Sequence, residues 1–293
     1  MSDNPKKMSQ PAIEPITDSD LLDYCRFLTR NLSNARTADE WAGAFRQNRG
    51  VEKPNNGFML RVEGQIVGGI GAIYARRLVR GKPEEFCNIT SWCVLDEYRS
   101  QSMRLAIALT SQPGFHFTDL TPTEVVSRTL QFLKFRPMNE RQAVWPNLPW
   151  PLSRLSGVRV ITDLNAIEAS LSPEAARAYL DHRHLSWLNH LAVGRPGDYC
   201  HVVYKKNRLK GLPGAFVLGF SSPEQFVKYR TALGNHLLFS NSLVFTRVES
   251  RLLTRVPWPG IELAGFRNKV FRSDTLAEAD ISNLYTEIVA LDL

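Results

Sequence analysis

The chain has 293 residues, 43% of them hydrophobic, and a formal net charge of +7 at pH 7. This is more than one ordinary domain uses and enough apolar material for a full core, so a disordered chain is excluded and two domains are expected. The positive charge suits an anionic partner. Lys and Arg are nevertheless spread along the chain, and no basic helix or finger spacing accompanies them, so nucleic-acid binding is not expected.

The four cysteines lie too far apart in the sequence for paired zinc ligands or a disulfide framework, so no metal site is predicted. Reduced thiols are typical of a cytoplasmic protein. Residues 1–10 lack the apolar core of an export signal, and no stretch approaches about 18 uninterrupted apolar residues. We therefore expect a soluble, cytoplasmic protein that does not insert into a membrane.

The first elements follow a leader over residues 1–11. A short strand is predicted over 12–16, a helix through about Leu32, and a second helix that starts at Thr37 and ends near Gly50. Two strands follow over 57–74, and Glu63-Gly64 between them is a two-residue hairpin signal.

Residues 86–135 are the stretch by reference to which the other predicted elements are placed. Residues 86–95 are rich in β-branched and aromatic side chains and contain no Gly or Pro, which predicts a buried strand. A helix is predicted over 100–110, a strand over 115–120, and a second helix with Thr121 as its N-cap. A strand that turns directly into a helix directs several N–H groups at one point, where the helix dipole favours an anion such as a pyrophosphate.

The second half repeats a similar series of elements. A proline-rich, aromatic crossover is predicted over 145–155, after a strand at 136–144. The tail is expected to form a helix from Asp274, with Ser273 as its cap. The elements predicted between them are a strand at 158–162, a helix from Ser172 through Tyr179 towards His190, strands at 199–204 and 215–220, a helix at 223–233, and segments at 236–239 and 243–248 without a clear period.

The segment VLDEYRSQSMRLAIAL, which begins at Val94, resembles the acetyl-coenzyme A loop of the GNAT acyltransferases. In that family a strand ends in Val-x-Pro-x-Tyr-Arg and the chain continues through Arg/Gln-x-x-Gly-x-Gly/Ala into a helix. Val94, Tyr98 and Arg99 match this pattern, whereas Ser102 and Arg104 stand at the two glycine positions. Asp96 replaces the proline.

The resemblance covers residues 12–150 and implies an α/β (α+β) fold, with a mixed central sheet flanked by helices. It implies an acyl-CoA-binding domain over 12–150. A second, degenerate GNAT-like domain is expected over 151–293, because the order of elements recurs there without the cofactor loop. The chain is similar in length and element order to the two-domain peptidoglycan aminoacyl transferases of the FemABX type.

The resemblance also implies the positions that contact acetyl-CoA or another acyl-CoA. Backbone at the end of the strand would pair with the pantetheine arm, and Val94 and Leu95 would donate the main N–H groups. The turn after it would hold the pyrophosphate. The predicted cofactor-binding residues are Cys93, Val94, Leu95, Arg99, Ser100, Gln101, Ser102, Met103 and Arg104.

Acyl transfer of this kind requires an oriented acceptor, a base and an oxyanion donor. The polar residues on the strands beside the loop are the candidates for the base: Asn88, Ser91, His116 and Asp119. His116 can titrate near neutral pH. Leu130 stands where the family carries the Tyr that protonates the leaving thiolate, so that hydroxyl is missing here.

These features predict an acyl-CoA-dependent acyltransferase with an unidentified amine or hydroxyl acceptor. The alternatives are a catalytically silent tandem module that binds acyl-CoA or a partner, and a FemABX-like aminoacyl transferase. The second half would shape the acceptor site, and the segment with the histidines at 182, 184, 190 and 201 would form a polar, aromatic wall of the acceptor cleft or of the domain interface. The residues favour no particular acceptor or oligomeric state.

Overall fold

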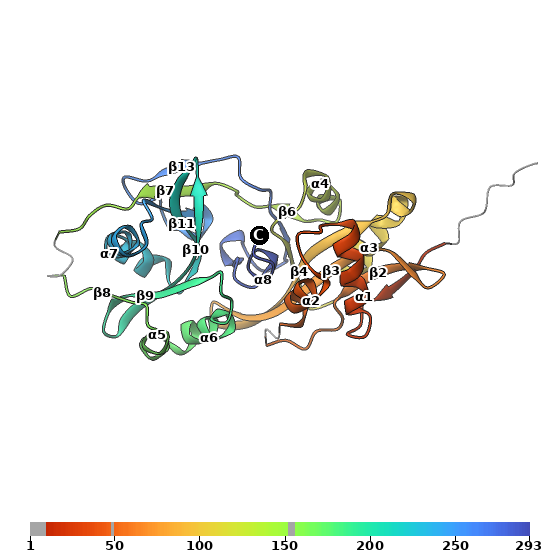
Figure 1. The fold of residues 1–293 in the computed structure, drawn as a ribbon, viewed down its shortest axis with the longest axis horizontal. Helices are drawn as coiled ribbons and strands as arrows, with labels where there is room; N and C mark the ends of the chain where they lie inside the picture. Colours follow the sequence, from red (N-terminus) through yellow and green to blue (C-terminus); the bar gives the residue numbers. More distant parts are fainter. Residues whose placement is uncertain (1–9, 48–49, 152–155) are drawn as a thin grey trace, which may run out of the picture. The chain divides into compact units, whose positions relative to one another are not determined.

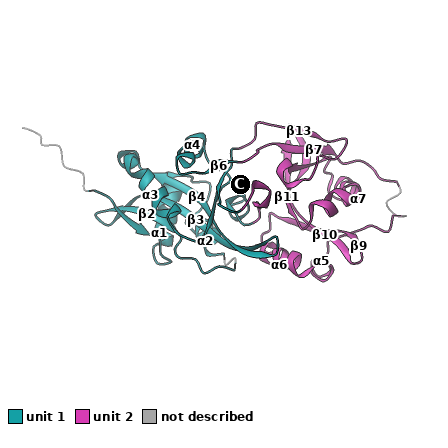
Figure 2. Ribbon diagram, turned by 180° about the vertical axis from the view of Figure 1, so that it is seen from behind, with its two compact units in different colours: residues 1–137, 268–275, 285–293 teal, residues 138–267, 276–284 magenta. Residues whose placement is uncertain are grey.

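The structure is a computed structural model that describes residues 10–47, 50–151 and 156–293. The chain forms two compact units, which Figure 2 distinguishes by colour. Unit 1 consists of the chain up to Pro137 together with 268–275 and 285–293, and unit 2 consists of 138–267 and 276–284. Unit 1 is therefore discontinuous, whereas the sequence predicts two consecutive domains that meet at residue 150.

Unit 1 contains a seven-stranded sheet whose order is β1-β2-β3-β4-β5-β14-β6, and Figure 1 labels β2, β3, β4 and β6 of it. All neighbouring strands are antiparallel except β4 and β5, which run parallel because a helix connects them. The strands are β1 (Ala12–Pro15), β2 (Gly57–Val62), β3 (Gln65–Val79), β4 (Lys82–Val94), β5 (His116–Asp119), β6 (Arg136–Pro137) and β14 (Val270–Arg272). The helices are α1 (Leu21–Asn31), α2 (Ala38–Arg46), η1 (Asp96–Gln101), α3 (Ser102–Thr110), α4 (Glu124–Phe132) and α8 (Glu287–Ala290).

Two hydrophobic clusters form the core of unit 1. One contains the apolar faces of α1 and α2, and Ala290 and Leu291 from the end of the chain pack into it. The other contains Leu105 and Leu109 of α3 and Leu130 of α4, packed against the strands. The strand order positions β4 between these clusters, so its side chains alternate between the α1–α2 cluster and the α3–α4 cluster.

Unit 2 contains a second seven-stranded sheet, in the order β13-β7-β12-β11-β10-β9-β8. Its strands are β7 (Gln142–Pro146), β8 (Arg159–Ile161), β9 (Asn189–Arg195), β10 (Asp198–Leu209), β11 (Leu212–Phe220), β12 (Phe245–Glu249) and β13 (Ile261–Leu263). Its helices are α5 (Leu164–Ser170), α6 (Pro173–His182), α7 (Pro223–Asn241), η3 (Ser250–Leu252) and η4 (Glu278–Asp280).

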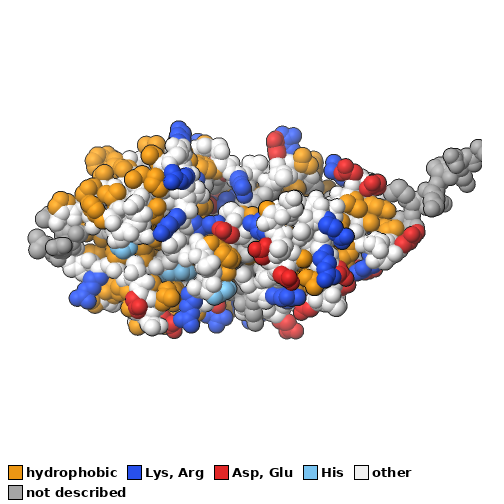
Figure 3. Space-filling model, in the orientation of Figure 1, with side chains coloured by type: hydrophobic (Ala, Val, Ile, Leu, Met, Phe, Trp, Pro, Cys, Tyr) orange, Lys and Arg blue, Asp and Glu red, His pale blue; other side chains and the backbone are white. Residues whose placement is uncertain are grey.

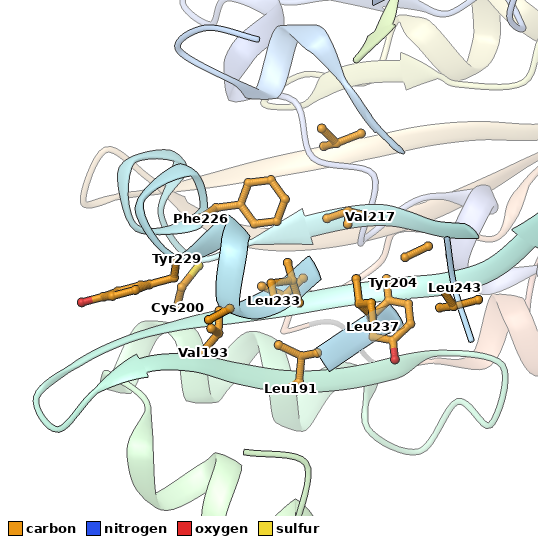
Figure 4. Close-up of a cluster of buried hydrophobic side chains, with 14 of the residues drawn as sticks. Leu191, Val193, Cys200, Tyr204, Val217, Phe226, Tyr229, Leu233, Leu237 and Leu243 are labelled. Carbon is orange, nitrogen blue, oxygen red and sulfur yellow. The ribbon is translucent and has the colours of Figure 1, made fainter. Parts of the chain in front are cut away.

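The core of unit 2 lies between α7 and its sheet. Figure 4 shows Phe226, Leu233 and Leu237 of α7 directed at Val193 and Val217 of the strands. The parallel pair β11 and β12 is connected by α7, as β4 and β5 are connected through α3. Both units thus have an antiparallel run of strands followed by a parallel pair around one helix, the arrangement expected for two related domains.

Several predicted boundaries are wrong. The N-cap of α4 is Thr123, whose hydroxyl accepts the Val126 N–H at 3.3 Å, and not Thr121. Helix α6 ends at His182, so His190 lies on β9. The hairpin between β3 and β4 was not predicted, and its turn places Arg80 and Gly81 at positive φ. The predicted crossover includes residues 152–155, which lie outside the described residues.

The tail does not form the predicted helix. After β14 it contains only short helical turns at η4 and α8, and its residues divide between the two units. Its apolar spacing reflects burial in two different cores rather than one face of a helix. Ile281 and Leu284 belong to unit 2, whereas Ile288 and Val289 belong to unit 1.

Figure 3 shows Lys and Arg side chains scattered over the visible face among Asp and Glu. They do not gather there into one basic patch. Within the part of the chain that the structure describes, no helix combines the length and apolarity needed to cross a membrane.

Candidate functional site

The site begins where β4 and β5 separate. They pair only from Phe86 to Asn88 on β4 and from His116 to Thr118 on β5. Strand β4 then continues to Val94 with β3 as its partner, so no strand of the described residues lies beside its other edge from Ile89 onward. The predicted parting of the two strands is confirmed, and it starts earlier along β4 than the sequence suggested.

A β-bulge lies on the open part of β4. The register with β3 shifts there, so that Ile70 lies opposite both Ser91 and Trp92, and Ser91 adopts a positive φ of 52°. The hydroxyl of Tyr24, a buried residue of α1, donates to the Ser91 carbonyl at 2.8 Å. Tyr24 therefore holds the bulge from the α1–α2 side of the sheet.

The bulge determines which amides of β4 face the open edge. The Leu95 N–H donates to the Val67 carbonyl of β3 at 2.9 Å, so it is not available to a ligand, in contrast to the sequence-based expectation. Successive residues of a strand direct their N–H groups to opposite sides. The Val94 N–H is therefore directed away from β3, towards the gap.

A cavity of about 870 Å³ adjoins this edge. It extends from the end of β4 along η1 and the start of α3, with Val125, Val126 and Thr129 of α4 on another side. The indole Nε1 of Trp92, which also lines the cavity, is buried without a hydrogen-bond partner among the described residues. The predicted cofactor-binding residues that line the cavity are Cys93, Val94, Leu95, Arg99, Ser100, Ser102 and Met103.

The start of α3 forms the polar end of the cavity. The N-cap residue, Gln101, makes no side-chain capping bond, and η1 leads directly into α3, so that the Ser102 N–H donates to the Arg99 carbonyl. Arg99 is exposed and pairs with Asp96 at 2.5 Å. Arg104 does not line the cavity, because its guanidinium donates to the Gln101 side chain at 2.8 Å and to the Pro11 carbonyl at 3.4 Å. Gln101 does not line it either.

The candidate bases lie apart from one another. His116 contacts Glu84 through Nε2 at 3.0 Å and Ser273 through Nδ1 at 2.9 Å, and it does not line the cavity. The Ser91 hydroxyl lies 3.2 Å from that of Thr90. Asn88 and Asp119 are buried where β4 and β5 separate.

A buried glutamate that the sequence did not indicate joins these last two residues. Glu287 donates its N–H to Asn88 Oδ1 at 2.8 Å, and its carboxylate accepts the Leu120 N–H at 2.8 Å. Burial raises the pKa of Asp119 well above its usual range, and the Glu287 charge adds to this; burial also raises the pKa of Glu287. No local motif marks Glu287, because its position depends on the return of the chain to unit 1.

The corresponding gap in unit 2 is filled by the chain itself. Strand β11 continues beyond its last pair with β12 at Val217, but the Asn283 amide donates to the Leu218 carbonyl at 3.3 Å and to Glu249 at 3.0 Å. Leu284 packs against Gly219. Asn283 and Leu284 thus occupy the position in unit 2 that corresponds to the gap in unit 1.

Two of the histidines in unit 2 form a pair. His190 on β9 and His201 on β10 stack, and His190 Nδ1 lies 3.2 Å from His201 Nε2. His182 contacts the Ala178 and Leu284 carbonyls instead. Among the described residues, no group of three or more His, Cys, Asp or Glu could hold a metal ion.

Comparison with known proteins gave neither a matching family model nor a matching curated sequence. Solved structures do match. A GCN5-related N-acetyltransferase from Anabaena variabilis aligns over 90% of this chain and 72% of its own, with a TM-score of 0.60 and 10% identity. One from Kribbella flavida aligns over 92% and 72%, with a TM-score of 0.57 and 14% identity.

A probable N-acyltransferase from Enterococcus faecalis aligns over 90% of this chain and 72% of its own, with a TM-score of 0.56 and 11% identity. These matches show that the chain has the GNAT fold. They confirm the predicted fold class, a mixed α/β architecture with helices flanking the sheets.

Proposed function

We propose that unit 1 binds an acyl-CoA at the open edge of β4 and transfers the acyl group to an amine or hydroxyl acceptor. The observation that carries this proposal is the gap between β4 and β5, with a cavity beside it that reaches the N-terminus of α3. The GNAT fold supports the same assignment. Unit 2 then has no cofactor of its own.

The cavity residues fit the parts of an acyl-CoA. The pantetheine arm lies along β4, where the Val94 N–H and the unpartnered Trp92 Nε1 supply donors. The pyrophosphate binds beside the η1–α3 junction, where Arg99 and the hydroxyls of Ser100 and Ser102 line the cavity and can donate to it. Arg104 is not part of this site in our proposal, because its guanidinium is used elsewhere.

The reaction is a direct attack. The acceptor lone pair forms a bond to the thioester carbon, an amide of β4 stabilises the oxyanion, and the carbon–sulfur bond breaks to release CoA as a thiolate. Leu130 is fully buried in the core and cannot protonate that thiolate. Thr129, the residue before it, lines the cavity and is the nearest protein hydroxyl that we assign to this role.

The first test is ligand binding. Acetyl-CoA and longer acyl-CoAs should raise the unfolding temperature, because a ligand that binds only the folded chain stabilises it. Release of free CoA thiol with a panel of amines, amino sugars and alcohols then separates turnover from binding alone. Absence of any thermal shift would contradict the cofactor assignment, and a shift without thiol release would favour the silent binding module.

A matched pair of variants tests the placement of the phosphates. Arg99→Gln should weaken acetyl-CoA binding about tenfold, because a charge-assisted hydrogen bond contributes on the order of 1.5–3 kcal/mol when well formed and less when exposed. Arg104→Gln, a control with the same change five residues further along the chain, on α3, should leave binding within about twofold. Calorimetric titration at two salt concentrations measures both, and an equal loss would contradict the placement.

A further inference from the structure

Two carboxylates are buried together at the end of β5. Asp119 is 6% exposed and Glu287 is fully buried. No Lys or Arg of the described residues forms an ion pair with either. Unit 2 offers an internal comparison, because its buried Glu249 at the end of β12 pairs with Arg251 at 2.7 Å. The acid in unit 2 is neutralised, whereas the pair in unit 1 is not.

The hydrogen bonds of Glu287 leave one oxygen without a partner. Oε1 accepts from the Leu120 N–H at 2.8 Å and from the Thr121 hydroxyl at 2.9 Å. Oε2 is buried and has no partner among the described residues. An unsatisfied buried acceptor costs about 1–3 kcal/mol, and an unpaired buried charge costs more. Stability alone does not explain why a glutamate occupies this place.

The pair lies on the α1–α2 side of the sheet. Cys87 and Ile89 belong to the α3–α4 cluster, so Asn88 between them faces the α1–α2 side. Glu287 is bonded to Asn88, the last residue of β4 that pairs with β5. The carboxylate therefore lies at the closed end of the gap along which the thioester binds.

We propose that Glu287 accepts the proton of the acceptor group through the hydroxyl of Thr121. This inference rests on the proposed function. Thr121 is partly exposed and already donates to Glu287 Oε1, so it connects the buried carboxylate to a bound acceptor. The acceptor N–H or O–H gives its proton to Thr121 Oγ1 while Thr121 gives its own to Glu287. The acceptor lone pair forms the new bond to carbon, and the electron pair of the carbon–sulfur bond leaves on CoA.

The surroundings make the carboxylate a stronger base. Burial raises the pKa of Glu287 and outweighs the hydrogen bonds from Thr121 and Leu120, which lower it, and the Glu287 charge adds to the effect of burial on Asp119. The groups that face Glu287 from β4 and from the segment after β5 are neutral, namely Asn88, Leu120 and Thr121. Asp119 is the titratable group that faces it.

The experiment compares four variants in acetyl transfer to an acceptor that the wild-type protein uses. Glu287→Gln keeps an oxygen for the Leu120 N–H and the Thr121 hydroxyl, and should reduce kcat about 100-fold or more, the contribution typical of a general base. Thr121→Val, of nearly the same shape, should reduce it similarly. Thr121→Ser keeps the hydroxyl that Thr121→Val removes, so its kcat should be close to that of the wild type. Asp292→Asn changes an exposed acid in the same segment and should leave kcat unchanged.

Acetyl-CoA binding and unfolding temperature separate a chemical effect from a structural one. If Glu287→Gln binds acetyl-CoA as the wild type does, loses kcat, and loses the acidic limb of the pH profile, the assignment is supported. Activity within threefold of wild type in Glu287→Gln or Thr121→Val overturns it, as does a loss that Thr121→Ser does not restore. If the wild type transfers acetyl to no acceptor, the proposed function itself is refuted and this inference with it.

Discussion

Tyr24 connects the helical layer of unit 1 to the backbone that forms the site. Its ring lies against Gly69, where an added Cβ would come within 2.4 Å of it, and its hydroxyl reaches the Ser91 carbonyl. Because Gly69 of β3 has no side chain, Tyr24 of α1 can pass it and bond to the bulge on β4. The direction of the Val94 amide depends on that bulge.

Tyr24→Phe should lower the stability of the protein by about 1–2 kcal/mol, because the Ser91 carbonyl loses a buried donor. It should also lower kcat at saturating acetyl-CoA, because a bulge that is less well held positions the oxyanion donor less well. Tyr74→Phe is the matched control: it removes a hydroxyl that bonds to Asn55 at 2.9 Å, away from the cavity. Denaturant unfolding and steady-state kinetics measure both variants, and equal losses of kcat would contradict the role of Tyr24.

Individual residues show which features of the site a sequence pattern can predict. The pattern around Val94 located the turn and most of the residues that line the cavity. It could not show that the Leu95 amide is used by β3, because that depends on the register after the bulge. It also could not show that Arg104 turns towards Pro11, since the direction of a long side chain depends on its neighbours in space.

At the scale of elements, the pair of strands β9 and β10 carries the two stacked histidines. Burial, with an additional contribution from the neighbouring histidines, lowers the pKa of His190 to about 4 and that of His201 to about 3. In the unfolded chain the pKa of each histidine is near its ordinary value of about 6.5. Between pH 6.5 and the pKa values of the folded state, the unfolded chain therefore binds more protons than the folded chain. Stability from this pair is therefore complete above pH 6.5 and is lost as the pH falls towards 4 and 3.

Acidification from pH 7 to 4.5 should thus weaken unit 2 by on the order of a few kcal/mol. His201→Phe removes one titrating ring and should make the dependence on pH shallower, even if the variant is less stable at pH 7. Hydrogen exchange of the β9 and β10 amides, corrected for the intrinsic effect of pH, measures this. An unchanged slope in the variant would show that other groups cause the acid sensitivity.

Elements with a local signal were predictable. Helix α2 starts after Thr37 as expected, and Glu63 and Gly64 turn the β2–β3 hairpin as expected. The structure adds that Thr37 and Glu40 form a capping box. β14 was missed, because three residues carry too little periodicity to be recognised. The tail was predicted as a helix, because apolar residues buried in two separate cores imitate the spacing of one helical face.

For the molecule as a whole, the return of the chain to unit 1 is the feature that the sequence did not predict. Ile288, Val289 and Leu291 are buried there, and the Arg36 guanidinium donates to the Leu291 carbonyl. Burial of each large aliphatic side chain contributes about 1.5–3 kcal/mol. The final segment is thus a structural part of the unit that carries the site.

Removal of residues 287–293 should therefore destabilise unit 1 by several kcal/mol and increase hydrogen exchange in β4 and β5. The amides of α7 and β11, in the core of unit 2, should keep most of their protection, because none of the removed residues belongs to that unit. A control that replaces only the exposed Leu293 with Ala should exchange as the full chain does. Uniform loss of protection in both units would contradict their separation.

Because unit 1 is discontinuous in the sequence, its parts are synthesised at different times, and this affects folding during translation. Domains generally fold as they emerge from the ribosome, beginning at the N-terminus. Here the first 137 residues emerge without β14 and α8, and the whole of 138–267 is translated before those pieces exist. The nascent polypeptide must keep an unfinished sheet edge beside β5 while the inserted unit is synthesised, so the proposed site is complete only after residues 268–275 and 285–293 have been translated.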